Sequence, residues 1–265
     1  MKVGFIGCGN MGGALASAVS KCDGVSLCLS DYSTEKRDAL AKELSATPCT
    51  NKEIAKDCDF VFLGVKPNVI RDVVSDIKDE LLSNEGAVVV TMAAGVAISS
   101  LEEILPAVKI IRIMPNTPVT VGHGMITWCK NSRVGDCDGE AFSALLKKAG
   151  SLDLISEGQI DAASAVAGCG PAFVYIFAEA LADGGVKCGL PRDKAMEYAT
   201  KTLIGAAEMI LKTGKHPGKL KDEVCSPGGS TIEGVHTLED GAFRALAANA
   251  VISAFEKTKK LGETK

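Results

Sequence analysis

The chain has 265 residues, enough for one large domain or two smaller ones, and a formal net charge of −4. This mildly acidic balance offers no basic surface, so we expect no nucleic-acid partner and no anionic membrane partner. Hydrophobic residues make up 46% of the sequence but aromatic residues only 5%. We therefore expect a soluble globular protein whose helices pack through small side chains rather than rings.

The ten cysteines form no CxxC pair and no cluster with histidine. Disulfide frameworks are typical of short secreted chains, and zinc sites need closely spaced pairs of ligands. Neither pattern is present here. We therefore expect ten free thiols, no metal and a cytoplasmic location.

The first part of the chain alternates short apolar runs with helical patterns, which predicts a doubly wound parallel sheet with right-handed crossovers. The expected strands are residues 2–7, 26–30, 60–64, 87–91 and 109–114, with 125–129 and 152–155 extending the sheet at its edge. The expected helices are residues 12–21, 33–44, 69–82 and 99–105.

From about Gln159 the strand signals stop, and the remaining patterns are helical, interrupted by prolines. The expected helices are residues 160–185, with a break at Pro171, and 192–212, 219–225 and 230–261. The uncharged run 162–178 is short for a membrane span and rich in small residues, so we interpret it as a buried helix. These helices have more apolar surface to bury than one small bundle offers, which favours association of subunits. The domain prediction is therefore 1–158 and 159–265.

The first strand leads into a G-x-G-x-x-G turn, residues Gly7, Cys8, Gly9, Asn10, Met11 and Gly12. Gly7 permits the tight turn, Gly9 lets the backbone approach a pyrophosphate, and Gly12 allows close packing of strand and helix. Its place in a βαβ unit predicts a dinucleotide site rather than a merely glycine-rich turn. Asp31, at the end of the second strand, would bond the ribose hydroxyls of NAD and repel a 2′-phosphate, which favours NADH.

Two further turns follow later strands, at the edge where open α/β sheets bind ligands. They are Val65, Lys66 and Pro67 after the third strand, and Ala93, Ala94 and Gly95 after the fourth. Lys66 would meet a phosphate or ribose oxygen, or it is an ordinary surface lysine. The turn RIMPNTP, residues 112–118, is expected to border the nicotinamide.

The segment CSPGGSTIEGVHTLE, residues 225–239, joins a Pro-Gly-Gly turn to the start of a helical pattern. Unpaired N–H groups and the helix dipole favour an anion at such a helix start. Gly228 and Gly229 would let a carboxylate approach the backbone, beside the hydroxyls of Ser230 and Thr231. The alternative interpretation is that Ser230 and Thr231 only cap the helix.

These motifs resemble those of the pyrroline-5-carboxylate reductases, which make L-proline in the last step of its biosynthesis. The resemblance covers essentially the full length and rests on FIGCGNMG, FLGVKP, MAAGV, RIMPNTP, AVAGCGPAFVY and VCSPGGSTIEGVHTLE. It implies a Rossmann dinucleotide-binding domain followed by an all-helical dimerisation domain. It also implies reduction of an imine with NADH or NADPH, in a homodimer or larger ring whose site forms across the dimer. Asp31 departs from the small or basic residues usual for NADPH in this family.

The resemblance implies roles for single residues near the substrate. The substrate carboxylate would sit on the N–H groups of Gly229, Ser230 and Thr231, and the Thr231 hydroxyl would bond the ring nitrogen. Ser226 is a second catalytic candidate, with turn stabilisation as its alternative role. Glu157 resembles a substrate-side carboxylate, or it is a solvent-facing residue at the start of a helix.

Two further positions match the family pattern on the cofactor side. Asn51 resembles the asparagine that contacts the adenine-side ribose, with a helix N-cap as the alternative. The break at Gly168-Cys169-Gly170-Pro171 would place helix ends beside the nicotinamide.

Two other functions remain open at this stage. A β-hydroxyacid-type dehydrogenase shares the Rossmann-plus-helices plan but needs a lysine acid/base at the mouth of the helical domain. A non-catalytic dinucleotide-sensing regulator would keep the fold without turnover, although it would not need a second anion site. An imine that arrives protonated needs no strong general acid, which agrees with the isolation of His123, His216 and His236.

Overall fold

The computed structural model describes residues 1–263, which divide into two compact units. Unit 1 contains Met1–Cys169 and the part of the C-terminal helix that begins at Ala254, and unit 2 is Gly170–Ser253. The predicted domain boundary after residue 158 remains a proposal, and residues 159–169 pack with unit 1.

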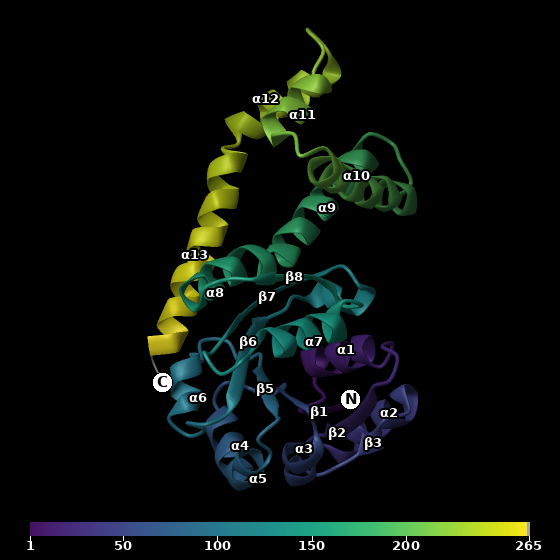
Figure 1. Ribbon diagram of the computed structural model, residues 1–265. Coiled ribbons are helices and arrows are strands. Elements are labelled where there is room, and N and C mark those ends of the chain that lie inside the picture. Colours follow the sequence, from purple (N-terminus) through teal and green to yellow (C-terminus); the bar gives the residue numbers. More distant parts are fainter. Residues whose placement is uncertain (264–265) are drawn as a thin grey trace. The chain divides into compact units, whose positions relative to one another are not determined.

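Unit 1 is built on an eight-stranded sheet with the order β3-β2-β1-β4-β5-β6-β7-β8 (Figure 1). The strands are β1 (Lys2–Ile6), β2 (Ser26–Ser30), β3 (Thr47–Pro48), β4 (Phe60–Leu63), β5 (Val88–Thr91), β6 (Lys109–Met114), β7 (Gly124–Lys130) and β8 (Gly150–Leu154). The first six are parallel, β7 is antiparallel to β6, and β8 is parallel to β7. The order 3-2-1-4-5-6 of the first six strands is that of a doubly wound dinucleotide-binding sheet, so the predicted fold class is confirmed.

Helices cover both faces of this sheet because its strands are apolar on both sides. On one face Phe5 stacks on Phe62 with ring centroids 4.5 Å apart, beside Leu15 of α1 and Phe142 of α7. The helices around this sheet, up to residue 146, are α1 (Asn10–Val19), α2 (Thr34–Leu44), α3 (Asn51–Asp57), α4 (Ile70–Asp76), α5 (Lys78–Ser83), α6 (Ile98–Glu102), the 3₁₀ helix η1 (Thr117–Val121) and α7 (Asp136–Leu146).

Several of these elements differ from the sequence prediction. The predicted helix 69–82 is two helices, α4 and α5, that meet at Ile77. Helix α7 is not predicted from the sequence, and α3 is implied only by the alternative role of Asn51 as a helix N-cap. Strand β3 has only two residues, one of them Pro48, and so carries no recognisable pattern.

The predicted helix break lies close to Pro171, at Cys169, where unit 1 gives way to unit 2, and helical turns come directly before and after it. The 3₁₀ helix η2 (Glu157–Gln159), α8 (Ile160–Ala163) and the π-helical turn η3 (Ser164–Gly168) follow one another directly, and α9 (Gly170–Lys187) begins after the single turn residue Cys169. Pro171 lies in the first turn of α9, where its missing N–H group is tolerated.

The remaining helices are α10 (Arg192–Thr213), α11 (Pro217–Glu223), α12 (Ser230–Asp240) and α13 (Phe243–Glu263). The single helix predicted over 230–261 is divided at Gly241 and Ala242, and Ala242 has a positive φ of 54°. The prediction of helix over 192–212 is confirmed by α10.

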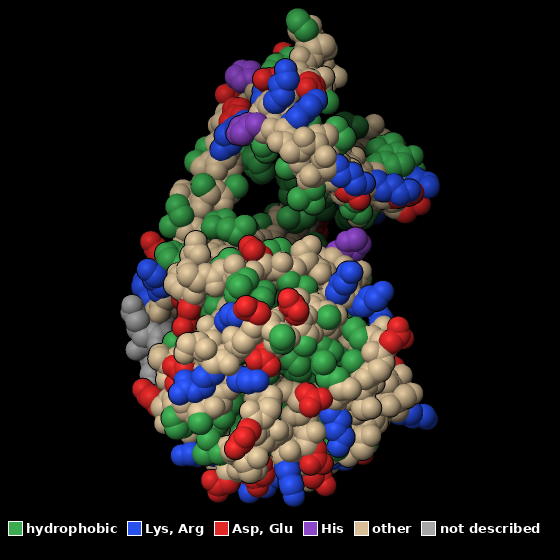
Figure 2. All heavy atoms as spheres, viewed as in Figure 1, with side chains coloured by type: hydrophobic (Ala, Val, Ile, Leu, Met, Phe, Trp, Pro, Cys, Tyr) green, Lys and Arg blue, Asp and Glu red, His purple; other side chains and the backbone are tan. Residues whose placement is uncertain are grey.

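Unit 2 buries little apolar surface within one chain. Its buried cluster is formed by Ala182, Ala195 and Ala199, with Val186 packed against them. Large apolar side chains such as Tyr175 and Ile176 are instead exposed on the helices. Figure 2 shows hydrophobic side chains at the surface of one face of the molecule.

One stretch of the described residues, Glu157–Lys187, is apolar enough to cross a membrane by length and composition, although only 17% of its most apolar window is buried. The interpretation of residues 162–178 as a buried helix is therefore wrong for the single chain. Such exposed apolar helices are expected where subunits associate.

Candidate functional site

The glycine turn after β1 has the close backbone packing that its sequence predicts. Gly7 has a φ of 100°, and a Cβ there would lie 2.7 Å from the carbonyl group of Gly64. A Cβ on Gly12 would clash with the carbonyl oxygen of Gly7. Both positions therefore require glycine for the protein's own packing.

Gly9 differs from these two glycines because a Cβ there would meet no protein atom within 4 Å. It is exposed, caps the N-terminus of α1 and lines a pocket. Open space beside a glycine at a helix N-terminus suits the close approach of a pyrophosphate to the backbone. The turn therefore fits the dinucleotide that the sequence predicts.

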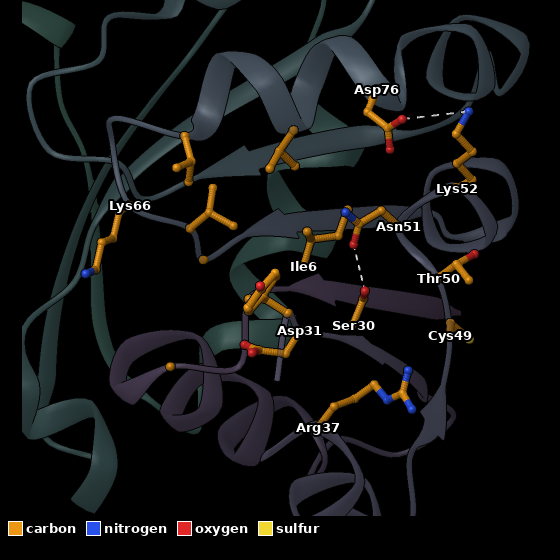
Figure 3. A pocket seen from close by; sticks show the side chains of 17 residues that line it. Ile6, Ser30, Asp31, Arg37, Cys49, Thr50, Asn51, Lys52, Lys66 and Asp76 are labelled. Carbon is orange, nitrogen blue, oxygen red and sulfur yellow. Dashed lines mark hydrogen bonds and ion pairs between the residues drawn. The ribbon is translucent and has the colours of Figure 1, made fainter. Parts of the chain in front are cut away.

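The pocket beside this turn has a volume of about 870 Å³ and opens at the carboxyl ends of β1, β2 and β4 (Figure 3). Its lining includes six predicted cofactor residues: Gly7, Gly9, Asp31, Asn51, Val65 and Lys66. Lys66 is exposed and lies on the opposite side of the pocket from Lys52 and Asp76 (Figure 3). This volume is within the range of ligand-binding pockets.

The other predicted cofactor residues lie outside the lining of this pocket. Pro67 and Gly95 line a separate hollow of about 310 Å³, and Asn10 lines another on the α1 surface. Ala93 is buried, Ala94 is exposed, and Met11 packs against the core on the α1 side. Contacts of these residues with a cofactor remain a proposal.

Asp31 is held by two backbone N–H groups at the end of β2. Its Oδ2 accepts a hydrogen bond from the Cys8 N–H at 2.6 Å, and its Oδ1 accepts one from the Ser33 N–H at 2.8 Å. The carboxylate therefore has a fixed place between the glycine turn and the start of α2. Each oxygen keeps a lone pair for a further donor.

Asn51 is the first residue of α3, and the helix N-cap is Thr50. The Thr50 hydroxyl accepts from the Glu53 N–H while the Glu53 carboxylate accepts from the Thr50 N–H at 2.7 Å, a reciprocal capping box. The interpretation of Asn51 as the N-cap is therefore wrong. Its side chain lines the pocket and accepts a hydrogen bond from the Ser30 hydroxyl at 2.6 Å.

Sequence reasoning missed several residues that line the same pocket. Tyr32 is fully exposed directly after Asp31, and Arg37 reaches the pocket from α2. Ser30 ends β2 and is 7% exposed. Its position at the carboxyl end of a central strand is the signal that would have identified it.

Glu157 forms part of a partly buried ion cluster around Arg112. The guanidinium group of Arg112, which is 4% exposed, donates to Glu157 Oε1 and to Asp161 Oδ1, both at 3.1 Å. Glu157 Oε1 also accepts from the Ile98 N–H at 2.7 Å. These contacts tie the start of the helical stretch to β6 and α6, so Glu157 is not simply solvent-facing. Its predicted role beside the substrate remains a proposal.

The predicted substrate segment begins with a tight turn. Pro227 and Gly228, with φ of 66°, occupy its central positions, and the Gly229 N–H donates to the Ser226 carbonyl oxygen at 3.0 Å. Pro followed by a glycine with positive φ is typical of a type II turn. The Gly229 N–H is therefore bonded within the turn, and its predicted contact with the substrate carboxylate remains a proposal.

Helix α12 begins at Ser230, and its N-cap is Gly229 with no side-chain capping bond. The interpretation of Ser230 and Thr231 as helix caps is therefore wrong, because they are the first two helical residues. Both are exposed, and neither hydroxyl makes a hydrogen bond within the part of the chain that the structure describes. Their backbone N–H groups lie in the first turn, where no intrahelical acceptor exists. This leaves them free to bind a carboxylate.

All ten cysteines are free thiols. Burial and the nearby Asp31 carboxylate raise the pKa of Cys8 to about 11. Burial also raises the pKa of Cys129 to about 11 and that of Cys49 to about 12. These thiols are protonated at neutral pH and behave as small apolar side chains. Among the side chains that the structure describes, those of residues 1–260, no group of three or more His, Cys, Asp or Glu is arranged to hold a metal ion.

The strand order, the glycine turn and the pocket at the point where the order reverses together define a dinucleotide-binding protein of the Rossmann class. Residues 2–95 match a family described as "NADP oxidoreductase coenzyme F420-dependent", and residues 157–261 match one described as "Pyrroline-5-carboxylate reductase dimerisation".

Full-length relatives define the family more narrowly. Pyrroline-5-carboxylate reductase of Arabidopsis thaliana is 39% identical over 268 residues, covering 99% of this chain and 96% of that protein. The enzyme of Escherichia coli K12 is 38% identical over 268 residues, with 99% of both chains covered. The chain therefore belongs to the pyrroline-5-carboxylate reductase family and is an NAD(P)H-dependent oxidoreductase.

Solved structures agree with this assignment. A Plasmodium falciparum pyrroline carboxylate reductase with NADP bound is 35% identical, with a TM-score of 0.89 over 99% of this chain and 98% of that one. The reductase of Coxiella burnetii is 30% identical, with a TM-score of 0.89 over 98% and 97% of the two chains. The match of the helical half to a dimerisation family, together with its exposed apolar side chains, supports a homo-oligomer.

Proposed function

We propose that the chain reduces the C=N bond of 1-pyrroline-5-carboxylate to give L-proline, the last step of proline biosynthesis. The observation that carries this proposal is that one chain of this family contains both a place for a dinucleotide and a place for a small carboxylate. Unit 1 has an open glycine turn suited to a dinucleotide, and unit 2 has a glycine-rich turn into α12 suited to a small carboxylate.

In unit 1 the first turn of α1 would hold the pyrophosphate, since the space beside Gly9 lets a phosphate reach the backbone. Asp31 and Asn51 would hold the adenine-side ribose. The bound cofactor supplies a hydride for the carbon of the imine. The protein's part is to orient that hydride donor and exclude competing reactions.

In unit 2 the N–H groups of Ser230 and Thr231 would hold the substrate carboxylate at the start of α12, where the helix dipole favours an anion. The Thr231 hydroxyl would accept a hydrogen bond from the protonated ring nitrogen. That nitrogen already carries its proton when the hydride arrives, so reduction leaves a neutral amine and requires no general acid. Ser226, whose hydroxyl lies against Gly229, would support the turn.

We further propose NADH as the preferred coenzyme and a homodimer through the helical half as the minimal assembly. The fixed Asp31 carboxylate would repel a 2′-phosphate, which supports NADH. Ten unpaired thiols support a reducing, cytoplasmic location.

The test is oxidation of NADH and NADPH by the purified full-length protein with 1-pyrroline-5-carboxylate, with L-proline identified as the product. Its matched control is 1-pyrroline, which has the ring imine but no carboxylate and should be reduced far less efficiently. Dinucleotide binding without turnover would contradict the reductase and favour a sensor. Oxidation of a β-hydroxy acid with NAD⁺ in place of imine reduction would favour the β-hydroxyacid-type dehydrogenase.

A further inference from the structure

We propose that Ser30 is a positioning residue for the adenine end of the dinucleotide site and that it acts through Asn51. This proposal depends on the proposed function in one respect only, the identification of the ligand as a dinucleotide coenzyme. Ser30 ends β2, is 7% exposed and lines the pocket. Its Oγ donates to Asn51 Oδ1 at 2.6 Å, across from the start of α3 (Figure 3).

The backbone of Asn51 is fixed without any help from Ser30. The reciprocal bonds between Thr50 and Glu53 set the first turn of α3. The fully buried Ile54 packs α3 against β1 where Gly4 has no side chain. Loss of the Ser30 hydroxyl should therefore leave α3 in place.

What α3 does not fix is the rotation of the Asn51 amide. The last torsion of an asparagine is broad and roughly two-fold, so the oxygen and nitrogen ends can exchange. A serine hydroxyl has one hydrogen to donate, and here it bonds the oxygen end. The Nδ2 group, which carries two hydrogens, is then the end left for the ligand.

The resulting chemistry is complementary to a ribose diol. Asn51 presents donors, while Asp31, adjacent to Ser30 on the same strand end, presents a carboxylate held by the N–H groups of Cys8 and Ser33. A vicinal diol can accept from the amide and donate to the carboxylate. The ligand class that this arrangement would recognise is a nucleotide with free ribose hydroxyls.

The experiment measures dissociation constants of NADH and NADPH for the full-length protein and for Ser30→Ala, Asn51→Ala and the double variant, in the absence of substrate. We expect Ser30→Ala to weaken NADH binding about 5-fold to 10-fold, the usual effect of one hydrogen bond. The double variant should bind no more weakly than Asn51→Ala alone. The value of kcat at saturating NADH should change little, so that the effect is confined to KM.

Two further variants separate positioning from general damage. Asn51→Asp keeps an acceptor for the Ser30 hydroxyl but removes the amide hydrogens, so it should weaken NADH binding at least as much as Asn51→Ala. Ser20→Ala removes a partly buried hydroxyl that bonds the Ser17 carbonyl oxygen at 2.9 Å, outside this pocket, and should leave binding unchanged.

Unchanged NADH binding in Ser30→Ala would overturn the proposal, as would losses that add in the double variant, because Ser30 would then act independently of Asn51. A protein that binds neither dinucleotide would overturn it as well. Binding that follows the expected pattern without turnover of 1-pyrroline-5-carboxylate would leave this proposal standing and remove the proposed function.

Discussion

The side-chain amide of Asn116 donates to the backbone carbonyl oxygen of Ala167 at 2.9 Å, four residues before Pro171. In a regular helix that carbonyl would accept from the N–H four positions further along the chain, which proline lacks. Asn116, 8% exposed, also accepts from the Met125 N–H at 2.9 Å. It therefore compensates for the proline and ties the π-helical turn η3 to the turn after β6.

This relationship predicts that Asn116 and Pro171 are energetically coupled. Asn116→Ala should lower the free energy of unfolding by about 1–3 kcal/mol, since two partly buried backbone groups lose their partner. In a Pro171→Ala background the same substitution should lower the free energy of unfolding by less, because the alanine introduced there has an N–H group that can donate to the Ala167 carbonyl oxygen. Urea unfolding of the four proteins at one protein concentration measures the difference.

Asn131 provides the matched control for this cycle. It is 6% exposed, accepts from the Ile110 N–H and donates to the Val108 carbonyl oxygen, so it makes both kinds of backbone bond at another place, together with a bond to the Glu102 carboxylate. Asn131→Ala should cost a similar free energy in both backgrounds. Equal costs of Asn116→Ala with and without Pro171 would show that the two residues are independent.

The glycine turn predicts opposite effects for two substitutions three positions apart. Gly12→Ala places a methyl group against the carbonyl oxygen of Gly7 and should destabilise the fold. Gly9→Ala meets no protein atom and should leave the melting temperature almost unchanged while weakening dinucleotide binding about 10-fold or more. Thermal unfolding and NADH titration measure the two effects separately. Tight NADH binding by Gly9→Ala would show that the pyrophosphate does not approach this position.

Asp31 should determine the choice of coenzyme. Replacing it with serine removes the negative charge beside the ribose, so kcat/KM with NADPH should rise relative to that with NADH by about 10-fold or more. Steady-state rates with both coenzymes test this. If the unmodified protein already prefers NADPH clearly, our assignment of Asp31 is wrong.

Thr231→Ala should lower kcat about 10-fold to 100-fold, the range for loss of one hydrogen bond to a charged group, and leave NADH affinity unchanged. Thr231→Ser, which keeps the hydroxyl, should restore most of the rate. Thr237 lies on the same helix, but its hydroxyl bonds the Glu233 carbonyl oxygen at 3.1 Å, so Thr237→Ala is the control. An unchanged kcat in Thr231→Ala would remove its hydroxyl from the mechanism.

Alkaline pH should destabilise unit 1 through its thiols. The pKa of Cys8 is raised to about 11 by burial and by Asp31, so the folded chain keeps this proton when the unfolded chain has lost it. The contribution of Cys8 to the free energy of unfolding is fully present below the pKa of the unfolded chain, near 9, and is lost as the pH rises toward 11. Urea unfolding from pH 8 to pH 11, compared with Cys8→Ser, checks the prediction: the variant should lose less stability than the unmodified chain over this interval.

The parts of the fold that sequence alone predicted depend on local patterns. The apolar runs of β1 and β4 and the glycines of the turn are each readable within about ten residues, which is the range of strand and turn signals. Helix α12 was predicted for the same reason. Its separation from α13 was not, because the positive φ of Ala242 leaves no mark in an otherwise helical pattern.

The contacts that sequence could not supply join distant positions. Asn116 and Ala167 are 51 positions apart, and Arg112 lies 45 positions before Glu157. In the substrate segment the residues were predicted, but the occupation of the Gly229 N–H by Ser226 was not, because it depends on the turn geometry. The strand-end position of Ser30 was a usable signal, but its pairing with Asn51, 21 positions away, could not be predicted from the sequence.

The exposed apolar side chains of α9 and α10, among them Tyr175, Ile176 and Ile204, make protein concentration a thermodynamic variable for this chain. If these surfaces are buried only between subunits, dilution shifts the equilibrium between associated and dissociated chains toward the dissociated form. In that form the buried cluster of unit 2 consists of three alanines with Val186 packed against them. Melting temperature should then rise with concentration. Until it associates with a second copy, a newly made chain would expose these apolar side chains and would be bound by chaperones.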